Sequence, residues 1–248
     1  MPEIHPTFEK MVRRLESRSP LAEGEREALL GLQQSIRKVA AGAHLVRDGE
    51  PPEQCALLLS GFAYRYKITG DGARQIVSLH IAGEFVDLQN SFLSISDHSV
   101  QTLTAAEVAF VPLQAIRDIT FAYPAIARAM WIDTLVDASI FREWVVNVGR
   151  RDSRARVAHI LCEFSLRLEE GGLAREHRYE LPMTQEQLAD AVGLTSVHVN
   201  RVLRQLGEEG LISRDRRSIT IQDWQRLRDA GDFNERYLHH DGEAIVRS

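Results

Sequence analysis

Cysteine and long apolar runs are both scarce in this chain of 248 residues. The two cysteines, Cys55 and Cys162, are too few for a disulfide framework or a four-cysteine metal site. No apolar run approaches the roughly 20 residues of a membrane-spanning helix. The first residues, Met1–His5, lack the charged and then apolar layout of a secretory signal. We therefore expect a cytosolic protein that makes no use of a membrane.

Catalytic motifs are absent from the sequence as well. The nine histidines and many carboxylates form no His-Glu-x-x-His pattern, nucleophile elbow or P-loop, so we do not expect an enzyme. The formal net charge of −5 argues against a surface coated in positive charge, but it leaves room for a local basic face. The length exceeds that of one average domain, so two folding units are expected.

Strand-like sequence fills the stretch between about Ile36 and Val111. Short apolar or alternating runs are separated there by turn residues such as Gly61 and Gly70-Asp71-Gly72. Many short strands at this spacing predict an antiparallel barrel or jelly roll, a shape suited to sensing or binding. Before it, Ser19-Pro20-Leu21 and the glutamates that follow predict a capped helix start.

A long helix is predicted from Pro124 to about Gly149, because no glycine or proline interrupts this stretch. Its apolar residues form two stripes. One has the spacing of a coiled-coil seam and contains Trp131, Leu135, Ala138, Phe141, Val145 and Val148. The other contains Ile126, Met130, Val136, Ile140 and Trp144. Two stripes need two partners, which favours packing on the barrel and on a second copy of the chain. The alternative is one buried core helix of a monomer.

The sharpest pattern lies between residues 184 and 221. Thr184 and Gln187 have the spacing of a capping box, and Gly193 marks a turn before a second helix capped by Thr195. The second helix has an apolar stripe at Val199, Val202, Leu203 and Leu206. Its opposite face contains Val197, Asn200, Arg201 and Arg204. The runs 211–213 and 218–221 then predict a hairpin with a basic tip. Together these elements predict a winged helix-turn-helix.

The basic face of this unit favours duplex DNA as the partner. An α-helix fits the major groove, and arginine matches the two acceptors of guanine. Residues 195–217 contain five arginines against Glu208, Glu209 and Asp215, a balance of +2. Arg204 and the wing arginines Arg214, Arg216 and Arg217 are placed to contact phosphates. The alternatives are a solvated charged face, or an effector-binding adaptor whose winged helix contacts protein.

The layout over about residues 20 to 222 resembles the bacterial Crp/Fnr transcription regulators. The most specific part is Met183-Thr184-Gln185-Glu186-Gln187-Leu188-Ala189-Asp190-Ala191-Val192-Gly193-Leu194-Thr195 and its continuation to Leu206. The resemblance implies an α+β fold with an N-terminal antiparallel β-roll or jelly roll, a long dimerisation helix and a C-terminal winged helix-turn-helix. We assign residues 1–122, 123–151, 152–232 and 233–248 to the sensor, the helix and hinge, the DNA-binding domain and a tail. The implied partners are double-stranded DNA, a second copy and RNA polymerase.

The same resemblance implies roles on the recognition helix. Arg201 stands where the family has a guanine-reading arginine, whereas Val197 replaces a base-reading glutamate. The predicted base-reading residues are Ser196, Val197, Asn200 and Arg201. The predicted phosphate contacts are Gln185, Thr195, His198, Arg204, Arg214, Arg216 and Arg217. The predicted dimer interface comprises Trp131, Ala138, Phe141, Val145 and Val148.

The sensor half departs from family members that bind cyclic AMP. Gly83-Glu84-Phe85 is present, but Asp87-Leu88 stands where Gly-Glu is expected. Ser96-Asp97-His98 stands where an arginine-bearing triplet is expected, and Phe141-Arg142 replaces an adenine-contacting pair. An acid in place of a cation disfavours a cyclic phosphate. The predicted effector pocket is therefore Gly83, Glu84, Phe85, Asp87, Leu88, Ser96, His98, Phe141 and Arg142, with a different ligand or none.

No cofactor is expected in this pocket. The lack of any cysteine before Cys55 argues against the iron–sulfur cluster of some family members. Haem is left open through His80 or His98, although a plain surface or pocket histidine is the simpler interpretation of either residue.

Overall fold

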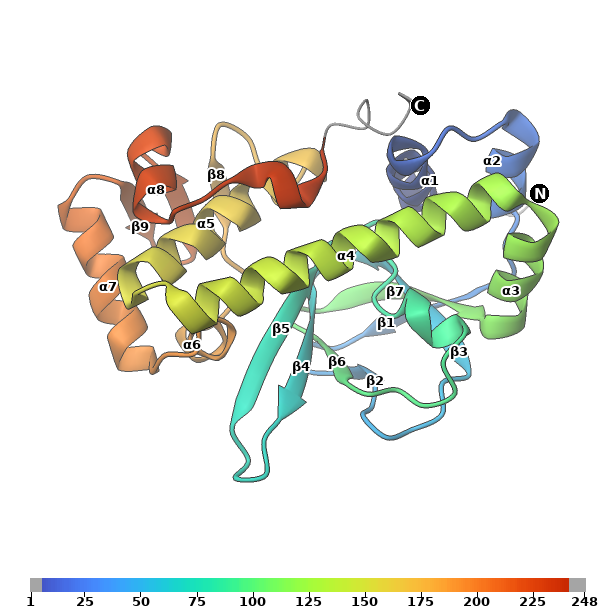
Figure 1. Ribbon diagram of the computed structural model, residues 1–248, viewed down its shortest axis with the longest axis horizontal. Helices are drawn as coiled ribbons and strands as arrows, with labels where there is room; N and C mark the ends of the chain where they lie inside the picture. The colour runs from blue at the N-terminus through green and yellow to red at the C-terminus, as the bar shows by residue number, and fades with distance from the viewer. Residues whose placement is uncertain (1–5, 241–248) are drawn as a thin grey trace. The chain divides into compact units, whose positions relative to one another are not determined.

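The computed structural model describes residues 6–240, which form two compact units (Figure 1). Residues 1–5, on which the expectation about a secretory signal rests, and residues 241–248 of the predicted tail lie outside the described residues. Unit 1 contains residues 6–67, 79–139 and 238–240, and unit 2 contains residues 68–78 and 140–237. The helix α4 (Pro124–Arg150) contributes its first part to unit 1 and its last part to unit 2.

The strands before α3 (Leu113–Ala122) form two sheets. One has the strand order β1–β7–β3, formed by Ser35–Val39, Ala106–Pro112 and Gln54–Ser60. The other has the order β2–β6–β4–β5, formed by His44–Val46, Ser99–Thr102, Ala63–Ile68 and Arg74–His80. The pairs β1–β7, β3–β7, β2–β6 and β4–β6 are all antiparallel. The predicted antiparallel β-roll is therefore confirmed.

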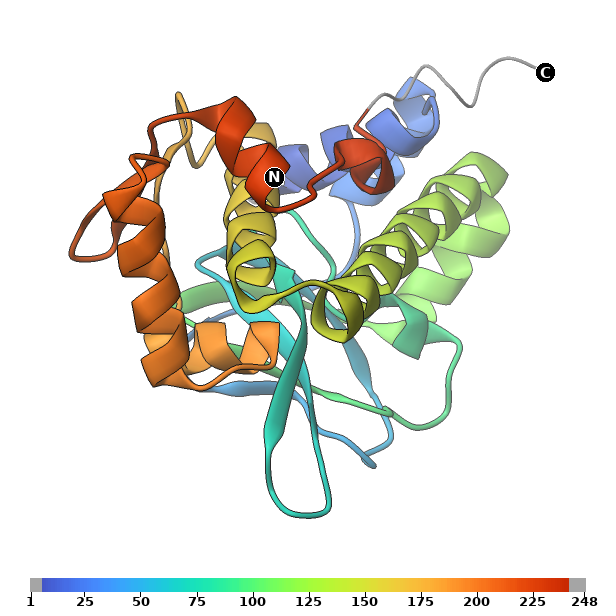
Figure 2. The same ribbon diagram turned by 60° about the vertical axis from the view of Figure 1, so that its left-hand side comes forward.

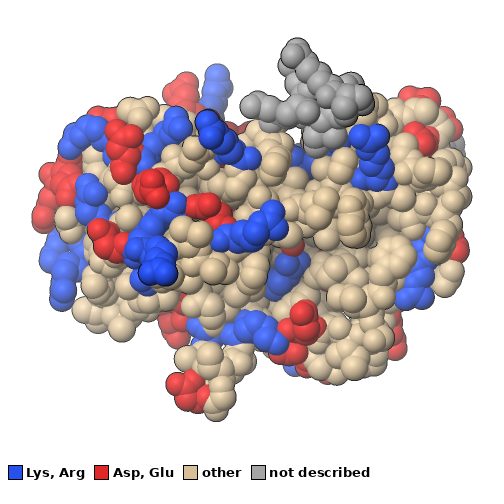
Figure 3. All heavy atoms as spheres, viewed as in Figure 1, with Lys and Arg blue, Asp and Glu red and all other residues tan. Residues whose placement is uncertain are grey.

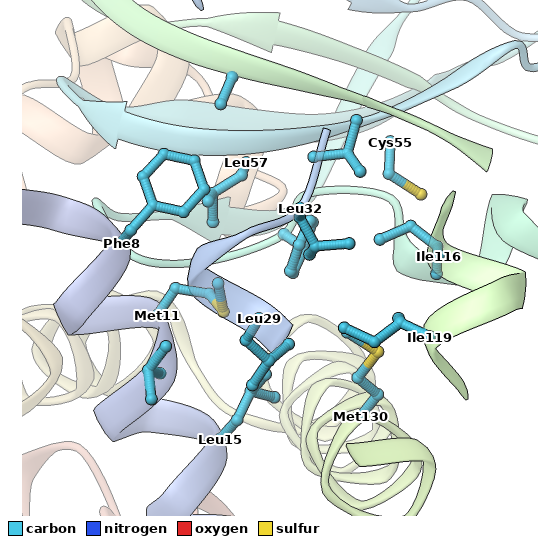
Figure 4. Packing of buried hydrophobic residues seen from close by; sticks show 14 of the residues in the cluster. Phe8, Met11, Leu15, Leu29, Leu32, Cys55, Leu57, Ile116, Ile119 and Met130 are labelled. Carbon is cyan, nitrogen blue, oxygen red and sulfur yellow. The ribbon is translucent and has the colours of Figure 1, made fainter. Parts of the chain in front are cut away.

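The core of unit 1 draws on helices as well as strands. Figure 4 shows side chains of α1 (Pro6–Arg18), α2 (Glu23–Leu30), β3, α3 (Leu113–Ala122) and α4 meeting in one cluster. Phe8 of α1 and Leu57 of β3 are completely buried in it. Helix α1 was not predicted, although Phe8, Met11, Val12 and Leu15 follow the i, i+3, i+4, i+7 spacing of a buried helix face.

The predicted start of α2 is wrong by three residues. The N-cap is Ala22 rather than Ser19, and its side chain has no oxygen with which to cap the helix. Instead, Ala22 N donates a hydrogen bond of 2.7 Å to Glu25 Oε2. A glutamate at the third helical position therefore does the capping, which is one half of the usual capping box.

The helix α4 has the two apolar stripes that the sequence predicts. Ile126, Met130, Val136, Ile140 and Trp144 are all buried, whereas Trp131, Leu135, Phe141 and Val145 are exposed. The expectation that the buried stripe packs only on the barrel is too simple, because Trp144 belongs to unit 2 and bonds to Glu163 there. None of the helices between residues 6 and 240, α4 included, combines the length and apolarity that crossing a bilayer requires.

Unit 2 has the elements of a winged helix-turn-helix. Its helices after α4 are α5 (Ser153–Glu170), α6 (Gln185–Val192), α7 (Ser196–Glu208) and α8 (Trp224–Ala230), followed by the short η2 (Glu235–Leu238). The strands β8 (Arg178–Glu180), β10 (Ser218–Ile221) and β9 (Ile212–Asp215) form one antiparallel sheet in that order. Figures 1 and 2 both show α8 beside α5. The predicted hairpin is β9–β10, and β8 adds a third strand that was not predicted.

A glycine at the β3–β4 turn gives the first testable prediction. Gly61 has φ +80°, and a Cβ there would lie 2.5 Å from Ala105 O. Gly61→Ala should therefore lower the free energy of unfolding by about 2–3 kcal/mol, because strain and a backbone clash add. Gly70→Ala is the matched control, since nothing lies within 4 Å of its Cβ position. Chemical denaturation should show a change below about 0.5 kcal/mol for the control, and equal effects would contradict this account of the turn.

Candidate nucleic-acid interface and effector pocket

The helix-turn-helix begins at α6 with a reciprocal cap. Thr184 Oγ1 accepts a hydrogen bond from Gln187 N at 3.1 Å, and Gln187 Oε1 accepts one from Thr184 N at 2.9 Å. The predicted capping box is confirmed. Gly193 then ends the helix at φ 64° and ψ 44°, a left-handed conformation that suits glycine. This turn leads the chain directly into α7.

The helix α7 separates a buried stripe from an exposed face, as predicted. Its N-cap is Thr195, whose side chain accepts a hydrogen bond from His198 N at 3.3 Å. The buried residues of α7 are Val199, Val202, Leu203 and Leu206. The predicted base-reading residues, Ser196, Val197, Asn200 and Arg201, are all exposed. The exposed fraction of Val197 is 70%, high for an apolar side chain, so this face presents both polar and apolar groups.

Two of the exposed residues differ in how they are held. Asn200 Oδ1 accepts a hydrogen bond of 2.9 Å from Gln185 Nε2, which ties the start of α6 to the middle of α7. The Arg201 side chain is exposed and forms no hydrogen bond or ion pair within residues 6–240. A guanidinium without an internal partner keeps all five of its donors for an outside acceptor.

The predicted phosphate contacts lie on α6, α7 and the wing. His198 faces α5, with Nε2 2.9 Å from Ser153 Oγ. Arg204 lies 3.9 Å from Glu208, but both side chains are over 70% exposed, so this pair holds the arginine only weakly. Within the wing, Arg214 Nε donates to Arg216 O at 3.1 Å, and Arg216 takes a left-handed φ of 52° at the turn.

The wing arginines and the start of α6 border one hollow. A cavity of about 100 Å³ is lined by residues of unit 2 that include Thr184, Gln185, Arg214, Arg216 and Arg217. Three cations and a helix N-terminus therefore share one small area, which suits an anion such as a phosphate. The space-filling view shows lysine and arginine side chains with acidic ones between them over this unit (Figure 3). The charge is local and mixed, as the sequence balance predicts.

The predicted effector residues of unit 1 are largely engaged by their own unit. Glu84 is buried, with Oε1 3.1 Å from Arg14 Nη1 and Oε2 accepting a hydrogen bond from Ile81 N at 3.2 Å. Asp87 Oδ1 accepts one from Ala56 N at 2.9 Å. These bonds stabilise the fold of residues 83–88, which we call the effector segment. They also occupy groups that a ligand would otherwise use.

Asp87 also has an unmet hydrogen-bonding capacity. Its Oδ2 is buried and has no hydrogen-bond partner within the described residues. Burial raises the pKa of Asp87 to about 7, and the Ala56 amide and Arg65 oppose this rise. Asp87 and Ser96 line a cavity of about 430 Å³ together with residues of β2 and the loop after it, among them Arg47, Glu50 and Glu53. Acids outnumber arginine on this lining, which disfavours a phosphate.

The other predicted pocket residues of unit 1 form contacts within the protein. Gly83 has φ +98°, Phe85 forms a bridge to Leu57, and Leu88 packs against the apolar core. Ser96 Oγ accepts a hydrogen bond of 3.0 Å from Asn90 Nδ2. His98 Nδ1 lies 2.7 Å from Asp97 Oδ1.

Phe141 and Arg142, the last two residues of the predicted pocket, are both exposed on the part of α4 that belongs to unit 2. Their role toward a ligand stays a prediction.

Arg65, whose role was not predicted from the sequence, bonds to the effector segment. Arg65 on β4 donates to Val86 O and to Asp137 Oδ2, both at 2.8 Å. The Arg65 guanidinium thus joins the effector segment to α4 inside unit 1. An alternating strand read on its own gives no sign of this contact, because the partners lie 21 and 72 residues away.

The cysteines and histidines do not assemble into a metal centre within residues 6–240. Cys55 and Cys162 are both buried, and burial raises the pKa of each thiol. His80 is buried with Nδ1 3.4 Å from Glu84, and burial lowers the pKa of His80 and of His98. Neither histidine lines the cavity that contains Asp87.

Comparisons with known proteins match both halves of the chain. A model of the cyclic nucleotide-binding domain matches residues 36–123, and a model of the Crp-like helix-turn-helix domain matches residues 155–230. FixK2 from Bradyrhizobium japonicum has a similar structure, with a TM-score of 0.74 and 24% identity, over 80% of this chain and 98% of that chain.

Relatives of known role cover most of the chain. The transcriptional activator protein FnrL of Cereibacter sphaeroides is 27% identical over 228 residues, which are 88% of this chain and 90% of FnrL. The nitrogen fixation regulation protein FixK of Rhizobium meliloti is 29% identical over 195 residues, 75% of this chain and 82% of FixK. This chain therefore belongs to the Crp/Fnr family of transcription regulators and is not an enzyme.

Proposed function

We propose that the protein is a homodimer that reads an inverted-repeat operator and needs no cyclic nucleotide to do so. The observation that carries this proposal is the exposed face of α7, where Arg201 has no partner among the described residues and the wing arginines lie beside the start of α6. An exposed helix of this kind fits the major groove, and the flanking cations fit the phosphates on either side.

The side chains of the proposed interface have two roles, base reading and contact with the DNA backbone. Arg201 can donate to both O6 and N7 of a guanine, which gives base selection. Asn200 is positioned by Gln185 and has an amide group that can read a neighbouring base. Thr195, His198, Arg204 and the three wing arginines hold the helix against the backbone, where they fix its register without reading sequence.

The dimer is proposed from the uncovered stripe of α4. Trp131 is 66% exposed, Phe141 45% and Val145 54%. Apolar residues at coiled-coil spacing on an exposed helix face are covered most simply by the same stripe of a second chain. The half-buried Ala138 and Val148 continue the stripe, and a small residue at 138 allows the two helices to approach closely.

The effector proposal is negative for cyclic nucleotides. Glu84 is bonded to Arg14, and Asp87 brings an acid where the phosphate would lie. The arginine that such a phosphate needs is replaced by Ser96, which is itself bonded to Asn90. We expect neither an iron–sulfur cluster nor cyclic AMP here. Haem ligation by His80 would require its buried ring to leave Glu84, and ligation by His98 would require its buried ring to leave Asp97.

RNA polymerase completes the proposed set of partners. FnrL is named a transcriptional activator, and activation requires contact with the transcription machinery. The chromosome is in the cytoplasm of a bacterium, so a cytoplasmic location goes with this role. The adaptor alternative, in which the winged helix contacts protein, predicts that added salt leaves duplex DNA binding unchanged or that none occurs.

The reading face gives a paired prediction. Arg201→Ala should weaken binding to the selected operator by about 1–3 kcal/mol and relax the preference at one symmetric guanine. Arg216→Ala should weaken all sequences alike and reduce the dependence of log affinity on log salt by about one per protomer. Selection from random duplexes followed by a salt titration measures both. If Arg201→Ala keeps the base preference, the reading face has been assigned wrongly.

The stripe of α4 gives a prediction about assembly. Ala138→Glu should yield monomers, because two like charges would face each other across the seam. Ala138→Lys should do the same, and an equimolar mixture of the two variants should recover the dimer through opposite charges. Light scattering measures the masses, and circular dichroism checks that the fold is intact. A dimer of Ala138→Glu alone would move the interface elsewhere.

The sensor domain gives a prediction about ligands. Each lost charge-assisted contact removes about 1.5–3 kcal/mol, so two losses weaken cyclic nucleotide binding by more than roughly a hundredfold. Calorimetry should detect no micromolar binding of cyclic AMP or cyclic GMP, and operator affinity should not change when either is added. Micromolar affinity in this titration would show that the position assigned to Ser96 hides the true phosphate contact.

A further inference from the structure

A buried carboxylate in the middle of α5 connects three separate elements of unit 2. Glu163 is 2% exposed and accepts hydrogen bonds from Tyr237 Oη at 2.8 Å, Trp144 Nε1 at 2.9 Å and Arg167 Nη1 at 3.3 Å. Tyr237 lies in the segment after α8, Trp144 lies on α4, and Arg167 lies one turn further along α5. None of these residues belongs to the DNA-reading face.

The segment that carries Tyr237 is packed closely against α5. Gly231 ends α8 against the α5 backbone, where an added Cβ would lie 2.7 Å from His159 N. The ring of His159 is fully buried between Phe233, at 5.1 Å edge-on, and Tyr237, at 5.8 Å stacked. Its ring nitrogens lie 3.3 Å from Gly231 O and 3.0 Å from Tyr237 Oη. We call residues 231–237 the C-terminal strap.

A second tie holds the strap to the junction between α4 and α5. Only Arg151 and Asp152 separate the two helices. Arg151 Nη2 donates to Asp232 O at 2.9 Å and lies 3.2 Å from Asp232 Oδ2 and 2.6 Å from Glu143 Oε1. The side chain of Arg151 is 8% exposed, whereas the side chains of Glu143 and Asp232 are 24% and 83% exposed, so the guanidinium is held from its buried side by the junction and reaches the strap at the surface. The strap therefore contacts the junction at one end and Glu163 at the other.

Burial makes the cluster sensitive to the loss of a single donor. Burial raises the pKa of Glu163, whereas Arg167, Tyr237 and Trp144 act in the opposite direction. A buried carboxylate that loses one of its donors is costly, and the nearby chain rearranges to let water reach it. The donors on α4 and on the strap thus favour one arrangement of the two helices over all others.

We propose that the C-terminal strap is a clamp that fixes the angle between the end of α4 and the winged helix-turn-helix. The inference rests on the proposed dimer, in which α4 forms the seam and α7 reads DNA. A fixed angle at each protomer sets the distance and the rotation between the two recognition helices. The clamp therefore determines which spacing of half-sites the dimer accepts.

The geometry of DNA makes this spacing a sensitive measure. One base pair added between half-sites moves them apart by about 3.4 Å and rotates them by roughly 34°, given 10–10.5 base pairs per turn. A rigid dimer tolerates such a change poorly. A dimer with a loosened angle tolerates it better, but it binds the best spacing less tightly because only a fraction of its molecules has the competent arrangement.

The experiment compares two tyrosine-to-phenylalanine variants of the full chain. Tyr237→Phe removes the donor of the strap to Glu163. Tyr179→Phe is the matched control, since Tyr179 is also buried in unit 2 and donates a 2.9 Å hydrogen bond to α5, at Leu161 O, without touching the strap. Binding is measured to one selected half-site and to inverted repeats whose spacing varies by up to two base pairs either way. Hydrogen exchange over residues 145–156 reports the junction directly.

The clamp predicts a distinct pattern. Wild type and Tyr179→Phe should lose about tenfold or more in affinity when the spacing changes by two base pairs. Tyr237→Phe should lose less than about threefold, bind the best repeat about fivefold more weakly than wild type, and bind the single half-site within about twofold. Exchange over 145–156 should accelerate only in Tyr237→Phe. If Tyr237→Phe does not fold, Trp144→Phe, which removes the α4 donor, should give the same relaxed profile.

Contrary outcomes separate the two proposals. Failure of wild type to bind any inverted repeat overturns the proposed function and the clamp with it. A wild type that binds with a sharp spacing optimum, shared unchanged by Tyr237→Phe, leaves the function intact and overturns the clamp. Equal relaxation in Tyr179→Phe and Tyr237→Phe also overturns it, since the effect would then be a general loss of stability.

Discussion

One unbroken helix, α4, imposes the main physical constraint on this protein. It has 27 residues, and its apolar side chains cover more than one face. The chain itself buries the stripe that includes Ile126 and Trp144, but it leaves Trp131, Leu135, Phe141 and Val145 between 45% and 66% exposed. Apolar area of this extent in water is unfavourable until a second surface covers it. The proposed dimer follows from this imbalance, and the presentation of two recognition helices follows from the dimer.

The winged helix was predictable because its elements carry their own boundaries. Thr184 and Gln187 cap α6 across three residues, and Gly193 supplies a left-handed turn that other residues adopt at a cost. The parts that were missed depend on distant partners. The three-residue strand β8 exists only because it pairs with β10, some 40 residues later. The start of α2 was misplaced because Ser19 has the preferred composition of a cap, whereas Glu25 provides the actual one.

The sensor domain shows the same limit at the level of single contacts. The sequence indicated what a cyclic nucleotide would lack, since Ser96 and Asp87 stand where an arginine and a glycine are expected. It gave no sign of the internal cations. Arg14 bonds to Glu84, and Arg65 connects Val86 to Asp137. These arginines stabilise the effector segment by contacts within the protein, so its position against α4 does not depend on a bound phosphate.

The energetics of DNA reading explain why so many buried polar bonds lie away from the reading face. The proposed contact from Arg201 to a guanine would discriminate by only about 1–3 kcal/mol, and association and side-chain ordering oppose binding by a comparable or larger amount. If α7 moved freely relative to the rest of its domain, the entropic cost of ordering it on DNA would be larger. The hydrogen bond between Gln185 and Asn200 orders part of the face before DNA arrives. In the proposed clamp, the bonds of Glu163 and Arg151 act in the same sense on the whole domain, because they would fix the orientation of the elements that carry α7. Hydrogen bonds that do not touch DNA can therefore increase the affinity for DNA, because they reduce the ordering cost that opposes the favourable contacts with the bases.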